Sequence, residues 1–239
     1  MKTILIFLLV IFCSCKLISN NYVGIGLNYI NDIYFSKILS ISIKAKCCPE
    51  YLSGQGKSYS IKLFYDYNFF PDLQFNLGLG LDLQNSNFYI FYDENEFINI
   101  NGDPYQGVFR HSVDLDFQSL NPKLNFTYFI NNWIFKFSFG TIIVLQNNFT
   151  EMEEIILPID RGVFFENNSR KRNITKGKIS NLILPINTLL IISYKLKLNN
   201  KGDINLEPNF IFNYFSSFIQ NKSLNSIGYG FGLNLLILF

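Results

Sequence analysis

The sequence predicts an all-β fold, an eight-stranded antiparallel up-and-down barrel. Apolar residues alternate with small or polar ones at a period of two along most of the chain. Short clusters of Asn, Pro and Gly separate these segments, as turns between strands require. Aromatic residues make up 17% of the 239 residues and charged residues 16%. This composition excludes a disordered chain, and no apolar run approaches the roughly 20 residues of a spanning helix.

The first residues predict an export signal rather than part of the fold. Lys2 supplies a short basic region, and residues 4–12 form an apolar run of signal-peptide length. The stretch FCSC at residues 12–15 resembles a bacterial lipoprotein box with Cys15 as the lipid acceptor, although Phe12 matches it poorly. Ordinary cleavage nearby is the favoured interpretation, and lipidation at Cys15 is the alternative. We therefore expect a signal segment at 1–19 and a single barrel domain at 20–239.

Eight strands follow in order, and the last one shows the pattern best. They are expected at 22–30, 57–67, 73–92, 108–130, 133–146, 181–198, 203–216 and 224–239. In the fourth, Val113 and Phe117 hold one parity, whereas Leu120 and Leu124 hold the other. A β-bulge near Ser119 would return the apolar residues to one face. In the closing strand, one face carries only large apolar residues: Tyr229, Phe231, Leu233, Leu235, Ile237 and Phe239.

The connections alternate in length. Tight turns are expected at 68–72, 131–132 and 199–202, and long polar stretches at 31–56, 93–107 and 147–180, with a shorter one at 217–223. This alternation places both termini at the short-turn end. It is typical of a transmembrane barrel with short periplasmic turns and long extracellular loops.

The polar face of the strands favours a membrane barrel over a soluble one. A soluble barrel exposes its polar face to water and should carry many Lys and Glu residues there. Here that face is rich in Gly, Asn and Ser, which suit a crowded lumen. The apolar face carries Leu and Phe, with Tyr and Trp near strand ends, as lipid and its interfaces favour. A secreted soluble ligand-binding β-barrel is the alternative.

Charged residues on the polar face are expected to form a lumen network. Both signs are present, which predicts ion pairs that fill and rigidify an eight-stranded interior. A narrow passive channel is the alternative. The expected lumen residues are Lys62, Asp66, Asp82, Lys123, Lys136, Lys195, Lys197, Asp203 and Glu207.

Three stretches resemble a known family. They are CCPEYLSGQGKSYSIKLFYDY at 47–67, LPIDRGVFFENNSRKRN at 157–173 and LNNKGDINLEPNFIFNYFSSF at 198–218. They resemble exported Bacteroidetes-type proteins with an outer-membrane-protein β-barrel domain, a small OmpA-like eight-stranded barrel. The resemblance implies an outer-membrane architecture without an assigned activity. The chain departs from the family in its high Asn, Phe and Ile content. Its terminal Phe239 resembles the aromatic signal that outer-membrane assembly machinery recognises.

The sequence predicts neither catalysis nor a cofactor. Some eight-stranded barrels modify lipid A with a His beside Ser or Asp, so a lipid-A-modifying enzyme is an alternative. Here the single histidine, His111, precedes Ser112, and neighbours on a strand point to opposite faces. Two adjacent thiols, Cys47 and Cys48, with one histidine argue against zinc. These thiols form a disulfide, stay reduced or bridge to another molecule.

Basic residues gather in the stretch 147–180. If this stretch is extracellular, we expect a solvated charged loop in which Arg161, Arg170, Lys171 and Arg172 can pair with nearby glutamates. Contact with lipopolysaccharide phosphates is the alternative. A net charge of +2 argues against nucleic-acid binding. We therefore expect a monomeric outer-membrane protein with a structural, envelope-integrity or surface-recognition role. Its expected partners are outer-membrane lipid and, during biogenesis, the assembly machinery.

Overall fold

The computed structural model describes residues 21–38, 51–70, 74–100, 102–159, 162–164, 168–178, 182–219 and 222–238. Several predictions concern residues outside these ranges. They are the signal segment with Cys15, the pair Cys47 and Cys48, Arg161 of the basic stretch, and Phe239. No helix among the described residues is long and apolar enough to cross a membrane.

The described chain is almost entirely β-strand. Its strands are β1 (Tyr22–Ile38), β2 (Tyr51–Phe70), β3 (Phe75–Ile100), β4 (Asp103–Ile130), β5 (Trp133–Thr141), β6 (Ile143–Leu157), β7 (Lys171–Gly177), β8 (Leu182–Tyr194), β9 (Leu196–Lys197), β10 (Ile204–Ile219) and β11 (Lys222–Leu238). β6 continues β5 after Ile142, and β9 continues β8 after Lys195. Counting each continued strand once, and setting aside β7, which pairs only with β6, leaves eight barrel strands.

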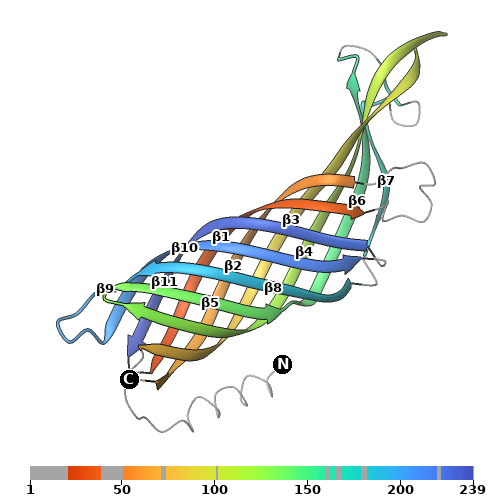
Figure 1. Cartoon of the computed structure of the whole chain (residues 1–239). Coiled ribbons are helices and arrows are strands. Elements are labelled where there is room, and N and C mark those ends of the chain that lie inside the picture. The colour runs from red at the N-terminus through yellow and green to blue at the C-terminus, as the bar shows by residue number, and fades with distance from the viewer. Residues whose placement is uncertain are drawn as a thin grey trace.

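The strands close into an antiparallel barrel, which confirms the predicted fold class (Figure 1). Each of the eight barrel strands pairs with the next one along the chain, and β1 pairs with β11 from Tyr22↔Leu238 to Ser36↔Leu224. Closure leaves no free edge around the barrel wall. The tight turns at 131–132 and 199–202 are also confirmed. Asn131 and Gly202 have the positive φ angles, 56° and 76°, that such turns use.

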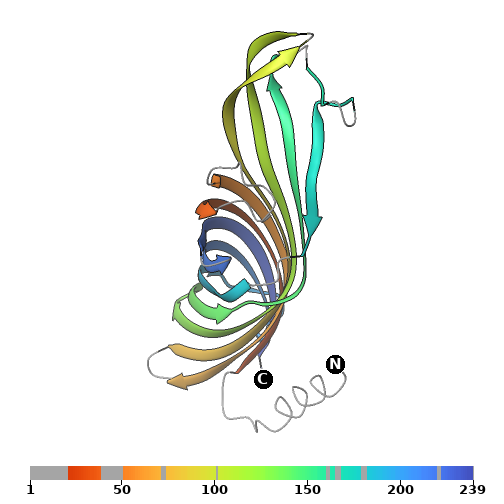
Figure 2. The same cartoon turned by 90° about the vertical axis from the view of Figure 1, so that its right-hand side faces the viewer.

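The strands at the opposite end are longer than the sequence predicted. β3 and β4 continue through the expected loop at 93–107, pairing as far as Ile100↔Asp103. β6 and β7 likewise occupy much of the expected loop at 147–180. These loop predictions were wrong because polar residues do not end a strand whose backbone groups are paired across a ladder. β3, β4, β6 and β7 therefore form a sheet that projects beyond the barrel (Figures 1 and 2).

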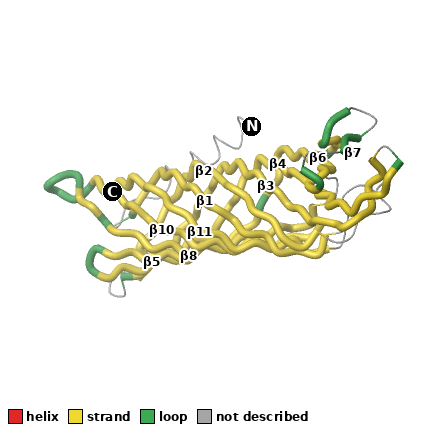
Figure 3. Tube along the Cα trace, turned by 90° about the horizontal axis from the view of Figure 1, so that it is seen from above, coloured by secondary structure: helices red, strands yellow, loops and turns green. Residues whose placement is uncertain are grey.

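Strands make up most of the length of the molecule, and the turns at 131–132 and 199–202 lie at one end of it (Figure 3). On β3 and β4, the pair Gln84↔Ser119 divides two parts with different side-chain distributions. We call the part toward the short turns the belt section. The part toward the Gly102 turn, together with β6 and β7, is the hairpin section.

Candidate functional site

Large apolar side chains cover the outside of the belt section. Leu79, Phe137 and Phe231 are 58%, 44% and 62% exposed, although a water-facing surface rarely holds such residues in number. Near the short turns, the Trp133 ring meets that of Tyr194 edge-on at 5.2 Å. Five closing-strand residues predicted to face outward belong to this apolar belt: Tyr229, Phe231, Leu233, Leu235 and Ile237.

The interior of the belt section is charged and polar along β2 to β5, and it also contains a small buried apolar cluster of Ile30, Leu189, Ile191 and Ile211. The Lys136 Nζ donates to Asp66 Oδ2 at 2.7 Å, and Thr127 Oγ1 donates to the same oxygen at 3.3 Å. Lys123 forms the corresponding pair with Asp82 across β3 and β4. All four charged side chains are buried, and Lys136 also lies 4.1 Å from the centre of the Phe64 ring. Each of these four buried charges therefore has an opposite charge close by.

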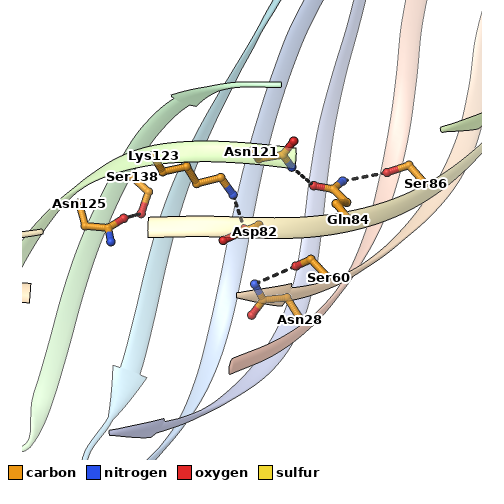
Figure 4. A network of polar contacts seen from close by, with 9 residues as sticks. All are labelled: Asn28, Ser60, Asp82, Gln84, Ser86, Asn121, Lys123, Asn125 and Ser138. Atoms are coloured by element: carbon orange, nitrogen blue, oxygen red, sulfur yellow. Dashed lines mark hydrogen bonds and ion pairs between the residues drawn. The ribbon is translucent and has the colours of Figure 1, made fainter. Parts of the chain in front are cut away.

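Neutral side chains extend this network toward the hairpin section. Asn121 Nδ2 donates to Gln84 Oε1 at 2.6 Å, and Gln84 Nε2 donates to Ser86 Oγ at 2.8 Å (Figure 4). Ser138 Oγ donates to Asn125 Oδ1 at 2.8 Å. These bonds tie together β3, β4 and β5 inside the barrel.

Asp32 is an interior carboxylate that the sequence analysis missed. It is 2% exposed and accepts hydrogen bonds from Asn213 Nδ2 at 2.9 Å and Ser58 Oγ at 3.2 Å. The first strand was predicted to end at residue 30, which left Asp32 in a loop. The available signal was its parity, because Asn28, Ile30 and Asp32 point to one face of a continuous strand.

The remaining predicted lumen residues divide between interior and mouth. Lys62 and Glu207 are buried, and Asn234 Nδ2 donates to Glu207 Oε2 at 3.3 Å. Lys195 is half-buried, with its Nζ 3.2 Å from the Tyr22 hydroxyl oxygen. Asp203 is also half-buried. Lys197 is exposed, contrary to expectation, because β9 ends the strand at the mouth rather than within the lumen.

The part of the hairpin interior that lies next to the charged layer is apolar. Val113, Leu115 and Phe117 of β4 are buried there against Phe88 and Tyr34. The aromatic rings of this cluster pack closely. The ring centroid of Phe88 lies 4.4 Å from that of Tyr34 and 5.3 Å from that of Phe117. This cluster fills the barrel above the charged layer.

This cluster corrects the predicted change of parity on the fourth strand. Odd-numbered residues of β4 face inward without interruption from Val113 to Thr127, so the strand does not turn over near Ser119. The irregularity at that level lies on β6 instead. Gln118 pairs with Gln146 and Ser119 with Val144, which leaves Leu145 as the extra residue. The apparent flip on β4 reflects an interior that changes from polar to apolar.

Two cavities in the described part of the interior are small. One of about 30 Å³ lies between Asp32, Phe88 and Asn213, and another of about 10 Å³ lies beside Lys62, Asp82 and Lys123. A space of about 10–15 Å³ holds roughly one water molecule. Side chains therefore fill most of these two regions of the interior.

His111 lies between two glutamates on the inner face of the projecting sheet. Its Nδ1 is 3.3 Å from Glu153 Oε1, and its Nε2 is 3.6 Å from Glu94 Oε2. The Tyr92 ring stacks on the imidazole at 4.9 Å. Arg172 Nε donates to Glu153 Oε2 at 2.7 Å. The hydrogen bonds with His111 and Arg172 hold the pKa of Glu153 below its usual range.

The basic stretch is engaged by its own chain. Besides the Arg172 contact, Lys171 Nζ lies 3.2 Å from Glu154 Oε2. Arg170 donates from its guanidinium to the carbonyl of Ile155 at 2.6 Å. These contacts fix β7 against β6. Within the described ranges, no group of three or more His, Cys, Asp or Glu side chains could hold a metal ion.

A closed antiparallel wall with an apolar outer belt and, at the level of that belt, a charged interior is typical of outer-membrane β-barrel proteins. Solved structures with which the chain can be aligned belong to this class. Neisserial surface protein A shares 10% identity at a TM-score of 0.35, over 92% of this chain and 97% of that one. The outer-membrane protease OmpT of Escherichia coli shares 8% at 0.39, over 95% and 100%. The attachment invasion locus protein Ail of Yersinia pestis shares 8% at 0.33, over 90% and 99%.

No protein-family model and no curated protein matches the chain. The resemblance to the Bacteroidetes-type family therefore stays a prediction. The structural likenesses are distant, and the fold is assigned from the strand pairing itself.

Proposed function

We propose that this chain is an integral outer-membrane protein whose barrel anchors the hairpin section outside the cell. The observation that carries this proposal is the apolar belt. Leucine and phenylalanine side chains such as Leu79 and Phe231 are more than half exposed around a wall whose interior is charged. In water this distribution would be inverted, whereas in a bilayer it is the one expected.

The outer faces of β3 and β4 change from apolar to polar at one level, and this change supports an edge of the lipid layer there. Leu83 on the outer face of β3 is 51% exposed, whereas the next outward residues, Asn85 and Asn87, are polar. On β4 the outward residues change from Leu120 to Gln118 and Asp116 at the same level. Polar residues beyond this level suit the headgroups and water. The short turns would then lie in the periplasm and the projecting sheet outside.

The filled interior supports a structural or surface-recognition role rather than transport. The charged layer around Asp66 and Asp82 and the apolar layer around Phe88 lie one above the other inside the barrel. An ion would have to break the pairs of the first layer and then cross the second without water. The barrel would therefore act as a rigid anchor for the projecting sheet.

Two measurements test the proposal. The protein should stay with membranes washed in carbonate, and it should migrate differently on detergent gels before and after boiling. Extraction by carbonate together with unchanged migration would count against membrane residence.

Conductance in planar bilayers tests the sealed interior. We expect no unitary currents from the native chain. A variant that combines Tyr34→Ala, Phe88→Ala and Phe215→Ala with Asp66→Ala and Lys136→Ala removes side chains from both layers and serves as the control that the assay detects an opened lumen. Steady currents from the native chain would favour the narrow channel instead.

A further inference from the structure

The outer face of the barrel carries a hollow immediately beyond the apolar belt, lined mostly by residues with polar side chains. Its volume is about 370 Å³, and it spans β2, β3, β4 and β6. Pairing in register places one row of exposed side chains across these four strands: Tyr59, Asn85, Gln118 and Gln146. Neighbouring strands lie about 4.8 Å apart, so the row extends about 14 Å. This length matches a short chain of sugar rings better than a single small ion.

A second row runs parallel to the first, farther from the belt. It contains Lys57, Asn87, Asp116 and Asn148. Asn87 Nδ2 donates to Asp116 Oδ1 at 2.7 Å, which orients both groups on the surface. The two rows together hold five carboxamides but only one cation and one anion. The hollow therefore has little net charge and many paired donors and acceptors.

The row on the other side of the hollow is apolar. Ile61, Leu83, Leu120 and Ile143 continue the same four-strand register one step toward the short turns. Leu83 and Ile143 are 51% and 49% exposed. The hollow thus begins where the belt ends, within reach of a lipid headgroup whose chains lie on the belt.

We propose that this hollow binds the sugar headgroup of a glycolipid in the outer leaflet, an inference that rests on the membrane location proposed above. Carboxamides both donate and accept hydrogen bonds, as neighbouring sugar hydroxyls do. The Tyr59 ring, 57% exposed at the edge of the hollow, offers an apolar face against which a sugar ring can lie. The belt below receives the acyl chains, so one molecule satisfies both surfaces.

The charge of the hollow selects this occupant over a phospholipid. A phosphate group is best bound by several cations or by the bidentate fork of arginine. The hollow contains a single lysine, Lys57, and its charge is opposed by Asp116. Neutral hydroxyls are therefore better matched than phosphate.

The experiment uses the full chain in nanodiscs that contain either lipopolysaccharide with its core oligosaccharide, lipid A without core sugars, or phosphatidylethanolamine alone. Lipid retained by the purified protein is then counted by native mass spectrometry. The test variant replaces Asn85, Gln118 and Gln146 with alanine. The matched control replaces Asn95 and Gln106, exposed amides on the same face but nearer the Gly102 turn. Heat-modifiable migration reports insertion of every variant separately.

We expect the native chain and the control to retain the core-bearing lipid in preference to lipid A, and the triple variant to retain about tenfold less of it. Free core oligosaccharide should bind far more weakly, because it lacks the chains that lie on the belt. Equal retention by an inserted triple variant overturns the inference, as does equal retention of phosphatidylethanolamine. If the triple variant fails to insert, the single variant Gln118→Ala is measured in its place. Equal lipid retention by that inserted variant also overturns the inference. A native chain that does not insert contradicts the membrane proposal instead.

Discussion

The belt section and the hairpin section are built from the same strands but have opposite faces. In the belt section, β3 and β4 place Asp82 and Lys123 inside and Leu79 and Leu124 outside. In the hairpin section, the same strands place Phe88 and Leu115 inside and mostly polar side chains outside, although Phe97 near the Gly102 turn is 80% exposed. The backbone alternates without a break through both. The surroundings, rather than the strand, therefore decide which side chains occupy each face.

The two sections consequently depend on different interactions. The hairpin section buries apolar side chains away from water, which is the usual hydrophobic stabilisation. In the belt section, the outer apolar residues would face lipid in either case, so interior pairs such as Lys136 with Asp66 specify the packing. Substitutions should therefore affect the sections by different mechanisms.

Breaking a charged pair in the belt section should have the largest effect. Asp66→Ala leaves Lys136 buried without its carboxylate and should cost about 3–5 kcal/mol. Denaturation in urea, followed by the loss of the compact band on gels, measures it. Adding Lys136→Met to Asp66→Ala should restore most of the lost stability. If the single and double variants are equally unstable, the pair does not hold the layer together.

Removing an apolar side chain from the hairpin interior should be nearly as costly. Leu115 is fully buried, and Leu115→Ala should cost about 2–5 kcal/mol by leaving a cavity. Leu115→Met keeps the volume and should cost under about 1.5 kcal/mol. Urea denaturation distinguishes them. Similar losses for both variants would argue that packing does not stabilise this interior.

An arginine introduced on the outer face should destabilise the belt section but have little effect on the stability of the hairpin section. Leu79→Arg places a charge in the middle of the belt and should cost about 2–4 kcal/mol in lipid. Asn95→Arg, on the same strand and the same face of the hairpin section, should change stability little. Refolding yields in phospholipid vesicles measure the difference. Equal tolerance at both positions would contradict the membrane boundary.

Acidification should have the smallest of these effects. It should loosen the hairpin section, where Glu153 lies, before the belt section. The lowered pKa of Glu153 means that its contacts with His111 and Arg172 stabilise the fold above the ordinary glutamate pKa of about 4.3 and are lost as pH falls below it. Limited proteolysis by pepsin should then cut between β6 and β7 more readily at pH 3 than at pH 5. In Glu153→Gln this increase should shrink. If cleavage of Glu153→Gln increases as much as that of the native chain, the pH dependence arises from other titratable groups.

Sequence periodicity predicted the barrel, its strand order and most of the charged interior. Lys62, Asp66, Asp82, Lys123, Lys136 and Glu207 lie on a buried face that alternates with apolar residues, so parity located them. The same rule failed where the interior becomes apolar. There Val113 and Phe117 look like outward residues, because hydrophobicity marks the lipid side in one section and the interior in the other.

The His111 contacts could not be predicted for a related reason. Glu153 and Arg172 belong to strands that were expected to be loops, and their pairing depends on the β4–β6 and β6–β7 registers. Register arises from long-range pairing and a bulge at Leu145, and neither has a local sequence signal. The polar composition of these segments concealed their strand character.

The unbroken ladder between β3 and β4 also bears on how the chain folds. It runs from Phe75↔Tyr128 to Ile100↔Asp103 and joins residues that lie close in sequence. The β1–β11 ladder joins the two ends of the described chain, from Tyr22 to Leu238. Contacts between near neighbours cost less chain entropy and form faster. We therefore expect the β3–β4 hairpin to zip first from its Gly102 turn and to template the later strands, leaving the β1–β11 seam to close last.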